Sequence, residues 1–294
     1  MITYLKATLA MLFWALTFVW IKVALETYRP IEIVFLRLVL ASLLLFTVML
    51  LSGHWQKINR KDMLHMMLVS LCEPFLYFLG EANGMQHVSA TLGSLIISTI
   101  PIVTAVGAWL FLREKIYPLL VVGLIVSFSG VAVMSLGTDD LAATTTGILF
   151  LLLAVMAGML YGLLIRSLTL KYSALTIVAW QSFFGLIYFV PVFFINDWSH
   201  FINLQHSTRG LTTIAGMSIF ASVGAFLLYT GVIRELGVIR ANIFTNLIPV
   251  FTVILAFLIL GDRLNTQSSI GLALTLTGLV ISQYRDLQRL RRRF

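Results

Sequence analysis

The chain has 294 residues, of which 60% are hydrophobic and 11% charged, and its mean hydropathy is +0.99. A soluble domain is nearer half apolar and a quarter charged, so this composition excludes a water-soluble fold and indicates a polytopic membrane protein. The net charge of +8 raises nucleic-acid binding as a function, but the cations lie in short connectors and a tail. That distribution favours a membrane protein with no nucleic-acid partner.

Ten segments are apolar and long enough to cross a bilayer, which takes about 20 residues of helix. In chain order they cover residues 5–25, 30–51, 64–84, 91–112, 118–136, 147–166, 175–195, 212–233, 239–260 and 268–284. Pro30 and Pro118 stand where helices are expected to begin, and Gly53 and Gly261 stand where the chain is expected to turn. The first segment lacks the small-residue cleavage site of a signal peptide, so we expect it to be retained.

Lys and Arg are distributed unevenly between the two ends of the predicted bundle. With both termini on one side, that side collects fifteen of them and the opposite side four, while Arg37 lies within the second segment. Cytoplasmic connectors carry the excess of positive charge, so the sequence predicts a multi-pass protein of the inner or plasma membrane with both termini in the cytoplasm. The Arg-rich tail is expected to lie against anionic membrane lipid.

An internal repeat is the most informative feature. When the sequence is shifted by 148 positions, SLIISTIPIVTAVGAWLFLREK from Ser94 aligns with NIFTNLIPVFTVILAFLILGDR from Asn242. The aligned pairs include Pro101 with Pro249, Thr104 with Thr252, Gly123 with Gly271 and Gly130 with Gly278. Each unit holds five segments, and an odd number places the second unit upside down in the membrane.

We therefore predict an all-α membrane protein of ten transmembrane helices arranged as two inverted five-helix repeats. The first repeat is expected at residues 1–137, the second at 147–284 and a basic cytoplasmic tail at 285–294.

A recurring set of residues accompanies this arrangement: Trp14 in the first segment, Arg37 in the second, and Pro101, Thr104, Glu114, Gly123 and Gly130 towards the end of the first repeat. With these residues and its five-plus-five segments, nearly the whole chain resembles the EamA-like transporters of the drug/metabolite transporter superfamily. The resemblance implies a ten-helix transporter, in a family whose members move amino acids, sugars, nucleosides, quaternary amines and drugs. The second repeat departs from the pattern with Asp262, where Glu is usual.

Glu73 and Pro74 interrupt the third segment, within LCEPFLYFLGE at residues 71–81. A carboxylate at the centre of a membrane helix costs about 2.5–3.5 kcal/mol, so Glu73 needs a partner, a water-filled cavity or a proton. Pro74 cannot donate a hydrogen bond to the preceding turn, and Tyr77 lies one turn beyond Glu73 on the same face. A broken helix beside an acid is typical of a midplane binding site. The alternative is a structural acid buried against a Ser, a Tyr or Arg37.

Two further charged residues lie at related depths. Glu81 is closer to the outer end of the third segment, where a gate function and a snorkelling or Arg37-paired acid fit equally well. Arg37 lies between the depths of the two acids. Its residue type suits a structural counter-ion as well as a substrate ligand.

Prolines and amides mark the fourth and ninth segments. Pro101 and Pro249 remove equivalent helix hydrogen bonds, so together with Pro74 they are candidate hinges. Asn242 and Asn246 lie one turn apart, and they align with Ser94 and Ser98 in the fourth segment. Because amides are costly in hydrocarbon, this face should look into protein or water, and helix–helix contact is the alternative to a binding face. The candidate substrate or coupling residues drawn from these segments are Ser98, Asn242 and Asn246.

Aromatic side chains complete the predicted site. Trp14, Tyr161, Trp180 and Tyr229 are candidates for an inward-facing lining, although each type is also common in membrane packing. The sequence has no Walker-type loop, no HExxH, no GxSxG and a single cysteine, Cys72. We therefore expect no cofactor, no metal site and no catalytic residue.

These features predict a secondary active transporter that moves a small amine-bearing or amphipathic metabolite, such as an amino acid-like compound, by alternating access. Glu73 is expected to bind a proton, another coupling ion or a substrate ammonium. Membrane lipid is the other expected partner. A membrane-embedded enzyme would need a nucleophile–base pair or metal ligands at depth, and a channel or scaffold would not need inverted halves with paired prolines. These two alternatives remain for experiment to exclude.

Overall fold

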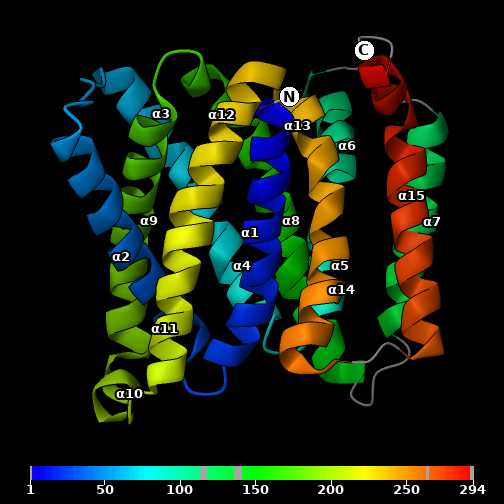
Figure 1. The fold of residues 1–294 in the computed structure, drawn as a ribbon, viewed down its shortest axis with the longest axis horizontal. Helices are drawn as coiled ribbons and strands as arrows, with labels where there is room; N and C mark the ends of the chain where they lie inside the picture. The colour runs from blue at the N-terminus through cyan, green and yellow to red at the C-terminus, as the bar shows by residue number, and fades with distance from the viewer. Residues whose placement is uncertain (1, 113–117, 136–140, 263–264, 292–294) are drawn as a thin grey trace.

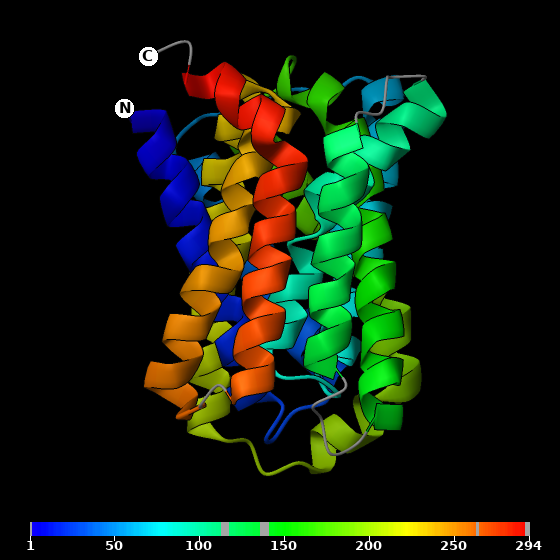
Figure 2. The same cartoon turned by 90° about the vertical axis from the view of Figure 1, so that its right-hand side faces the viewer.

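The computed structural model describes residues 2–112, 118–135, 141–262 and 265–291, and within these ranges it contains helices and no strand. The long helices run side by side in a single bundle, and α1 begins at the end where α15 finishes (Figure 1). We call that end of the bundle the terminal end and the opposite end the far end. The view turned by 90° shows the start of α1 and the last turns of α15 at the same end of the bundle (Figure 2).

Ten membrane segments can be followed along the described chain. Six are single helices: α1 (Ile2–Ala24), α2 (Pro30–Leu51), α7 (Pro118–Ser135), α8 (Leu141–Thr169), α9 (Ala174–Asn196) and α15 (Thr266–Arg291). Four are interrupted: α3 (Arg60–Ser70), η1 (Leu71–Leu76) and α4 (Tyr77–Gly84); α5 (Ala90–Ile97) and α6 (Ile100–Leu112); α11 (Thr208–Gly216), η2 (Met217–Ala225) and α12 (Phe226–Leu236); α13 (Val238–Ile243), η3 (Phe244–Asn246) and α14 (Leu247–Leu260). The short α10 (Trp198–Asn203) lies in a connector.

Length and hydropathy agree with a multi-pass membrane protein. Seven helices of the described chain are long and apolar enough to cross a bilayer, and shorter apolar stretches cover 121–133, 244–260 and 266–282. Large apolar side chains also lie exposed on the outside of the bundle, as at Ile125 and Leu149. Lipid tails would cover such a surface, whereas water would not. The predicted all-helical membrane fold is confirmed.

The interruptions fall in equivalent places of the two repeats. The widened turn η1 in the third segment has its counterpart in η2 of the eighth, although η2 contains no proline. The gap between α5 and α6 has its counterpart in the tight turn η3 before α14. Pro101 and Pro249 follow these two breaks by a few residues. Since a helix interior proline removes one backbone hydrogen bond, the paired breaks fit the paired prolines.

The contact between α7 and α15 shows that the repeats are inverted. A β-carbon placed on Gly123 would lie 2.6 Å from the carbonyl oxygen of Gly278, and one placed on Gly130 would lie 2.6 Å from that of Gly271. Each glycine of one repeat thus contacts the residue aligned with the other glycine. A two-fold axis between antiparallel copies requires this pattern. Ser127 and Thr275, also 148 residues apart, meet at its centre, where the Thr275 hydroxyl donates to the Ser127 carbonyl at 3.4 Å. The two helices lie side by side in both views (Figures 1 and 2).

Some predicted boundaries fall outside the described residues. The division expected at residue 137 lies within 136–140, and Glu114 and Lys115 lie within 113–117. Of the predicted tail, residues 285–291 continue α15, while 292–294 are not described.

Candidate functional site

The third membrane segment is interrupted at Glu73. After α3 ends, Glu73 adopts extended backbone angles (φ −145°, ψ 119°) inside the widened turn, and Pro74 follows. The carbonyl of Glu73 accepts a hydrogen bond of 3.1 Å from Nε2 of Gln181 in α9. A side chain of the second repeat therefore binds the opened backbone of the first. The helix break expected at Pro74 is present, whereas its function as a hinge stays a prediction.

Arg37 of α2 is buried and held on three sides. Its Nε donates to the Ser222 hydroxyl at 2.6 Å, its Nη1 lies 3.7 Å from Oε2 of Glu81, and its Cζ lies 4.2 Å above the ring of Phe78. Tyr77 donates its hydroxyl to Glu81 at 3.3 Å. Opposite charges, a hydroxyl and a ring face together stabilise the guanidinium away from water. Arg37 therefore serves as the counter-ion of Glu81.

The carboxylate of Glu73 has no such counter-ion. Within the described residues, no hydrogen bond or ion pair reaches it, although its side chain is buried. A buried carboxylate without a partner is unfavourable unless it binds a proton or a ligand. Of the two roles that the sequence leaves open for this acid, the geometry favours binding over structural pairing.

A cavity joins these residues across the two repeats. It encloses about 730 Å³ of empty space, open solvent included, and is lined by residues of α1, α2, η1, α4, α5, α6, α8, α12, α13, η3 and α14. Eight of the residues singled out in the sequence line it: Trp14, Arg37, Glu73, Tyr77, Glu81, Tyr161, Tyr229 and Asn242.

A second wall of the cavity carries aromatic rings from both repeats. Tyr229 of α12 donates its hydroxyl to the side-chain oxygen of Asn242 in α13. Trp14 packs edge-on against Tyr229 and Phe226, with ring centroids 4.8 and 5.4 Å apart. The wall therefore combines π-faces with a polar pair, opposite the charged wall formed by Arg37 and the glutamates.

Three predicted site residues do not line the cavity. Ser98 is buried and donates its hydroxyl to the carbonyl of Leu95 at 2.7 Å. Trp180 packs in an aromatic cluster on α2 and α9, 5.6 Å from the ring of Phe46. Asn246 belongs to the turn η3 and is absent from the cavity wall. Of the candidate hinges, Pro74, Pro101 and Pro249 all lie next to helix breaks and outside the lining.

Some lining residues gave no signal in the sequence. Phe78 and Phe226 are ordinary aromatic residues of apolar helices, yet they occupy equivalent positions on opposite walls. Ser222, the partner of Arg37, lies in η2, which contains no proline from which a widened turn could be predicted. Only the repeat alignment could have found it, because Ser222 is aligned with Pro74.

The cavity extends towards the terminal end. Ile233, Val238 and Asn242, which lie near the α12–α13 turn, all line it. The equivalent residues of the first repeat are Met85, Ala90 and Ser94; they are fully buried and do not line it. At the far end, a β-carbon on Gly84 would lie 3.0 Å from the carbonyl oxygen of Gly147, so α4 and α8 are in close contact there. The cavity thus reaches further towards the terminal end than towards the far end.

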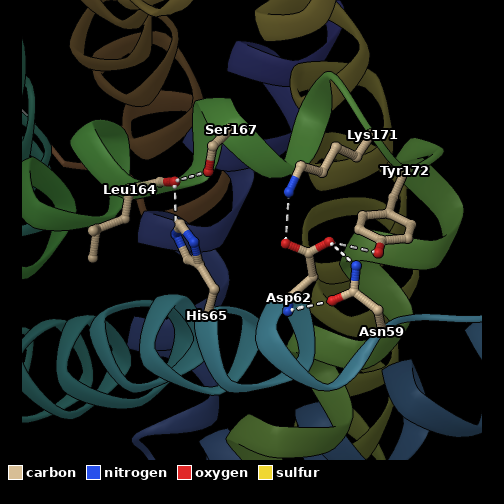
Figure 3. A network of polar contacts seen from close by, with 7 residues as sticks. All are labelled: Asn59, Asp62, His65, Leu164, Ser167, Lys171 and Tyr172. Carbon is tan, nitrogen blue, oxygen red and sulfur yellow. Dashed lines mark hydrogen bonds and ion pairs between the residues drawn. The ribbon is translucent and has the colours of Figure 1, made fainter.

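A polar network links the two repeats at the terminal end (Figure 3). Asp62 of α3 accepts hydrogen bonds from Lys171 at 2.7 Å and from the Tyr172 hydroxyl at 2.8 Å, while Asn59 caps α3. The hydrogen bond to Asp62 raises the pKa of Lys171 above its ordinary value. Next to it, His65 contacts the carbonyl of Leu164 at 3.1 Å. This network binds the α2–α3 connector to the α8–α9 connector.

An equivalent set of contacts closes the far end. There, the α1–α2 connector meets the region around α10: Glu32 lies 2.6 Å from His200, Arg29 lies 3.1 Å from Asp197, and Tyr28 contacts His206 at 3.2 Å. The connectors involved are those that the shift of 148 residues relates to the terminal-end pair. Both sets are present in the same structure.

Two inverted repeats that enclose a charged, aromatic cavity between membrane helices define a multi-pass membrane protein built to hold a small molecule within the bilayer. Comparison with known proteins identifies the family. The model of the EamA-like transporter family matches residues 1–136 and 145–284, and the chain belongs to this family.

Relatives and a solved structure agree with this assignment. A protein of Archaeoglobus fulgidus named as an uncharacterized transporter is 25% identical over 289 residues, which is 97% of this chain and 99% of that protein. The uncharacterized transporter YetK of Bacillus subtilis is 25% identical over 258 residues, which is 86% of this chain and 78% of its own. A crystal structure of a protein 14% identical in sequence matches 96% of this chain and 97% of its own with a TM-score of 0.69, which shows a shared fold. These likenesses indicate a transporter rather than an enzyme.

Proposed function

We propose that this membrane transporter is a secondary carrier of a small amine-bearing or amphipathic metabolite, which it moves by alternating access. The observation that carries the proposal is Glu73. Its carboxylate lines the central cavity, is buried, and lacks a partner among the described residues. A cation that enters the cavity supplies that partner.

The charges of the cavity favour a singly charged cation. Arg37 and Glu81 neutralise each other, so Glu73 leaves one negative charge for the ligand. The faces of Trp14, Phe226 and the neighbouring rings attract a desolvated ammonium and also cover an apolar body. Phosphorylated substrates fit less well, because they need cationic clamps and the lining cation Arg37 is already paired.

A site that binds either a proton or an ammonium provides coupling. When Glu73 is protonated the site is neutral and releases a cation, and when Glu73 is ionised the site binds one. The sequence has no ATP-binding motif, so the energy comes from a gradient of substrate, protons or another ion. A substrate and a proton that compete for one carboxylate give exchange across the membrane.

The asymmetric cavity supports alternating access. Inverted repeats make the two ends of the bundle structurally equivalent, yet among the described residues the cavity reaches towards the terminal end and not equally towards the far end. Exchange of the two repeat conformations opens the far end and closes the terminal end.

We place the terminal end in the cytoplasm, with the protein in the inner or plasma membrane, because the excess of Lys and Arg lies there. Gln56 and Gln205 are exposed in connectors at opposite ends of the bundle. In a chain carrying Cys72→Ala, an impermeant thiol reagent added outside cells should label Gln205→Cys, while Gln56→Cys should react only after the membrane is opened. Labelling of both from one side would contradict this topology.

The function is tested by counterflow in proteoliposomes. Vesicles loaded with one unlabelled amine or amino acid should accumulate the labelled compound transiently, and a saturating rate is expected for a carrier. A channel gives flux without counterflow, and an enzyme gives a chemically altered product. Either result would overturn the proposed carrier function.

A further inference from the structure

The missing far-end cavity has a defined lining. At the terminal end, the cavity is lined by residues of α8, α12 and α13, among them Ile233 and Val238, and we call this region the terminal mouth. By the shift of 148 residues, the corresponding region at the far end lies between α1, α4 and α5, next to Met85 and Ala90, and we call it the far mouth. Met85 and Ala90 are fully buried and do not line the cavity. Ile233 is buried as well, so the two mouths differ in the cavity lining and not in burial.

Lys22 crosses the far mouth. From the last turn of α1, its Nζ donates to the carbonyl of Met85 at 2.9 Å and to the carbonyl of Val88 at 3.0 Å. Both carbonyls belong to the connector between α4 and α5. One half-buried ammonium thus ties together the elements that bound the far mouth. Hydrogen bonds of a charged donor contribute more than neutral ones, so this contact holds the mouth closed.

Among the described residues, the aligned positions of the terminal mouth carry no equivalent of this contact, although the guanidinium of Arg166 in α8 lies close to Gly237 in the α12–α13 turn. The residue aligned with Lys22 is Leu170, which is 65% exposed and has no donor group in its side chain. The carbonyls aligned with those of Met85 and Val88 belong to Ile233 and Leu236. Among the sequence differences between the two mouths, Lys22 thus gives the far mouth a cation where the aligned position of the terminal mouth has a leucine.

The other end-to-end contacts do not distinguish the two mouths. Asp62 with Lys171 at the terminal end and Glu32 with His200 at the far end join equivalent connectors, and both are formed at once. A contact that is present in both repeats in one conformation does not need to break when the repeats exchange conformations. The Lys22 contact is present in one repeat only.

We propose that Lys22 locks the far mouth, and that its release opens a second cavity lined by Met85, Ala90 and Ser94. The proposal rests on alternating access. It adds the residue that sets the equilibrium, in the absence of substrate, between the conformation open at the terminal end and the one open at the far end. Lys22 acts by positioning the α4–α5 connector and does not touch the substrate.

Thiol labelling of the purified full chain in detergent tests the lock without any substrate. In a Cys72→Ala background, Ser94→Cys reports the far cavity and Val238→Cys reports the terminal cavity. Lys22→Met removes both hydrogen bonds, and we expect the thiol at position 94 to react at least about 10-fold faster and that at 238 more slowly. Lys22→Arg keeps the charge and the donors, so it should restore the original rates.

The aligned position in the second repeat allows the converse experiment, in which a lysine is added at the terminal mouth. Leu170→Lys places an ammonium opposite the carbonyls of Ile233 and Leu236, and it should slow labelling at position 238. Unchanged labelling at position 94 in Lys22→Met would overturn the proposal. So would faster labelling at both positions, because a protein that is merely loosened reacts everywhere.

Counterflow of an amine, measured on the same variants, separates this inference from the proposed function. If labelling at position 94 does not change but counterflow persists, the lock is wrong and the carrier function stands. If labelling shifts as expected but no amine shows counterflow, the lock stands and the proposed substrate class is wrong.

Discussion

The two repeats meet at the α7–α15 contact and again around the central cavity. The two regions differ in whether aligned positions of the repeats carry the same side chain. At α7–α15, the aligned glycines Gly123 and Gly271 contact Gly278 and Gly130, so that each contact occurs twice. Around the cavity, aligned positions again face each other, but several carry different side chains. The aligned lining pairs are Trp14 with Gly162, Phe78 with Phe226, Glu81 with Tyr229, Ile97 with Thr245 and Ile100 with Ile248.

The comparison separates what the fold needs from what the site needs. Close packing of helix backbones needs small residues on both partners, so the repeat is preserved at α7–α15. A binding site for one small cation needs a single unpaired carboxylate, and the residue aligned with Glu73 is Ala221. Arg37 is aligned with Gly185, which instead packs against Pro74. The charged lining residues thus belong to one repeat, whereas both repeats contribute aromatic rings.

The largest expected effect comes from removing the charge that has no counterpart in the second repeat. Glu73→Gln keeps the shape of the side chain but cannot be ionised, so we expect loss of pH-dependent or cation-driven flux of at least about 10-fold. Stability should hold or rise, because an unpaired buried carboxylate is replaced by a neutral amide. Counterflow and thermal unfolding of the purified variant measure both effects. An unchanged rate and pH profile would make Glu73 a structural acid and move the binding site to Glu81.

The next effect concerns the charge pair within the same wall. Arg37→Met leaves Glu81 buried without its cation and should destabilise the protein by about 3–5 kcal/mol. The double variant Arg37→Met/Glu81→Gln should recover much of that loss, because no uncompensated charge remains. Chemical unfolding in detergent gives the comparison. A double variant no more stable than Arg37→Met would show that Arg37 acts through contacts other than Glu81.

At the symmetric contact, aligned substitutions should behave alike. Gly130→Ala and Gly278→Ala each place a methyl group against the backbone of the partner helix, and each should cost about 1–3 kcal/mol. Gly231→Ala is the matched control, because a β-carbon there has no atom within 4 Å. It should be neutral or stabilising by about 0.5–1 kcal/mol. Unequal losses at positions 130 and 278 would weaken the two-fold description.

The smallest effect is expected at the paired helix breaks. Pro101→Ala or Pro249→Ala restores a backbone donor and should leave the protein folded while changing the transport rate by several-fold. The aligned positions should respond in the same direction if both repeats bend there. Initial counterflow rates check this, with thermal unfolding as the control for folding. A double variant with full rate would show that these prolines only shape packing.

The fold was largely predictable because its determinants are local and repeated. Hydropathy marks the ten segments, and the aligned prolines and glycines identify the inverted repeat without any knowledge of contacts. The central site was partly predictable for the same reason. A buried acid such as Glu73 and an amide such as Asn242 are costly in hydrocarbon, so their positions in the sequence carry information.

The features of the site that the sequence did not predict depend on how α4 is rotated about its axis and on contacts with other segments. Regular helix spacing places Gly80 on the same face as Glu73, yet Gly80 packs against the backbone of α8, and a β-carbon there would lie 2.5 Å from the Phe150 carbonyl. The widened turn shifts the faces of everything after it. Ser222 and Lys22 were not identified for a further reason. The role of Ser222 comes from its contact with Arg37, and that of Lys22 from two carbonyls of the α4–α5 connector, and hydropathy along the chain shows neither contact.

The widened turn η1 also sets the angular phase of α4. Each residue advances an α-helix by about 100°, so one extra residue in a turn rotates all later side chains by a comparable angle. Glu81 faces Arg37 and Gly80 faces α8 only in the present phase. A single-residue deletion in η1 would shorten the span by only one residue while turning Glu81 away from its counter-ion. The charge balance of the cavity is thus encoded by residue count as much as by residue type.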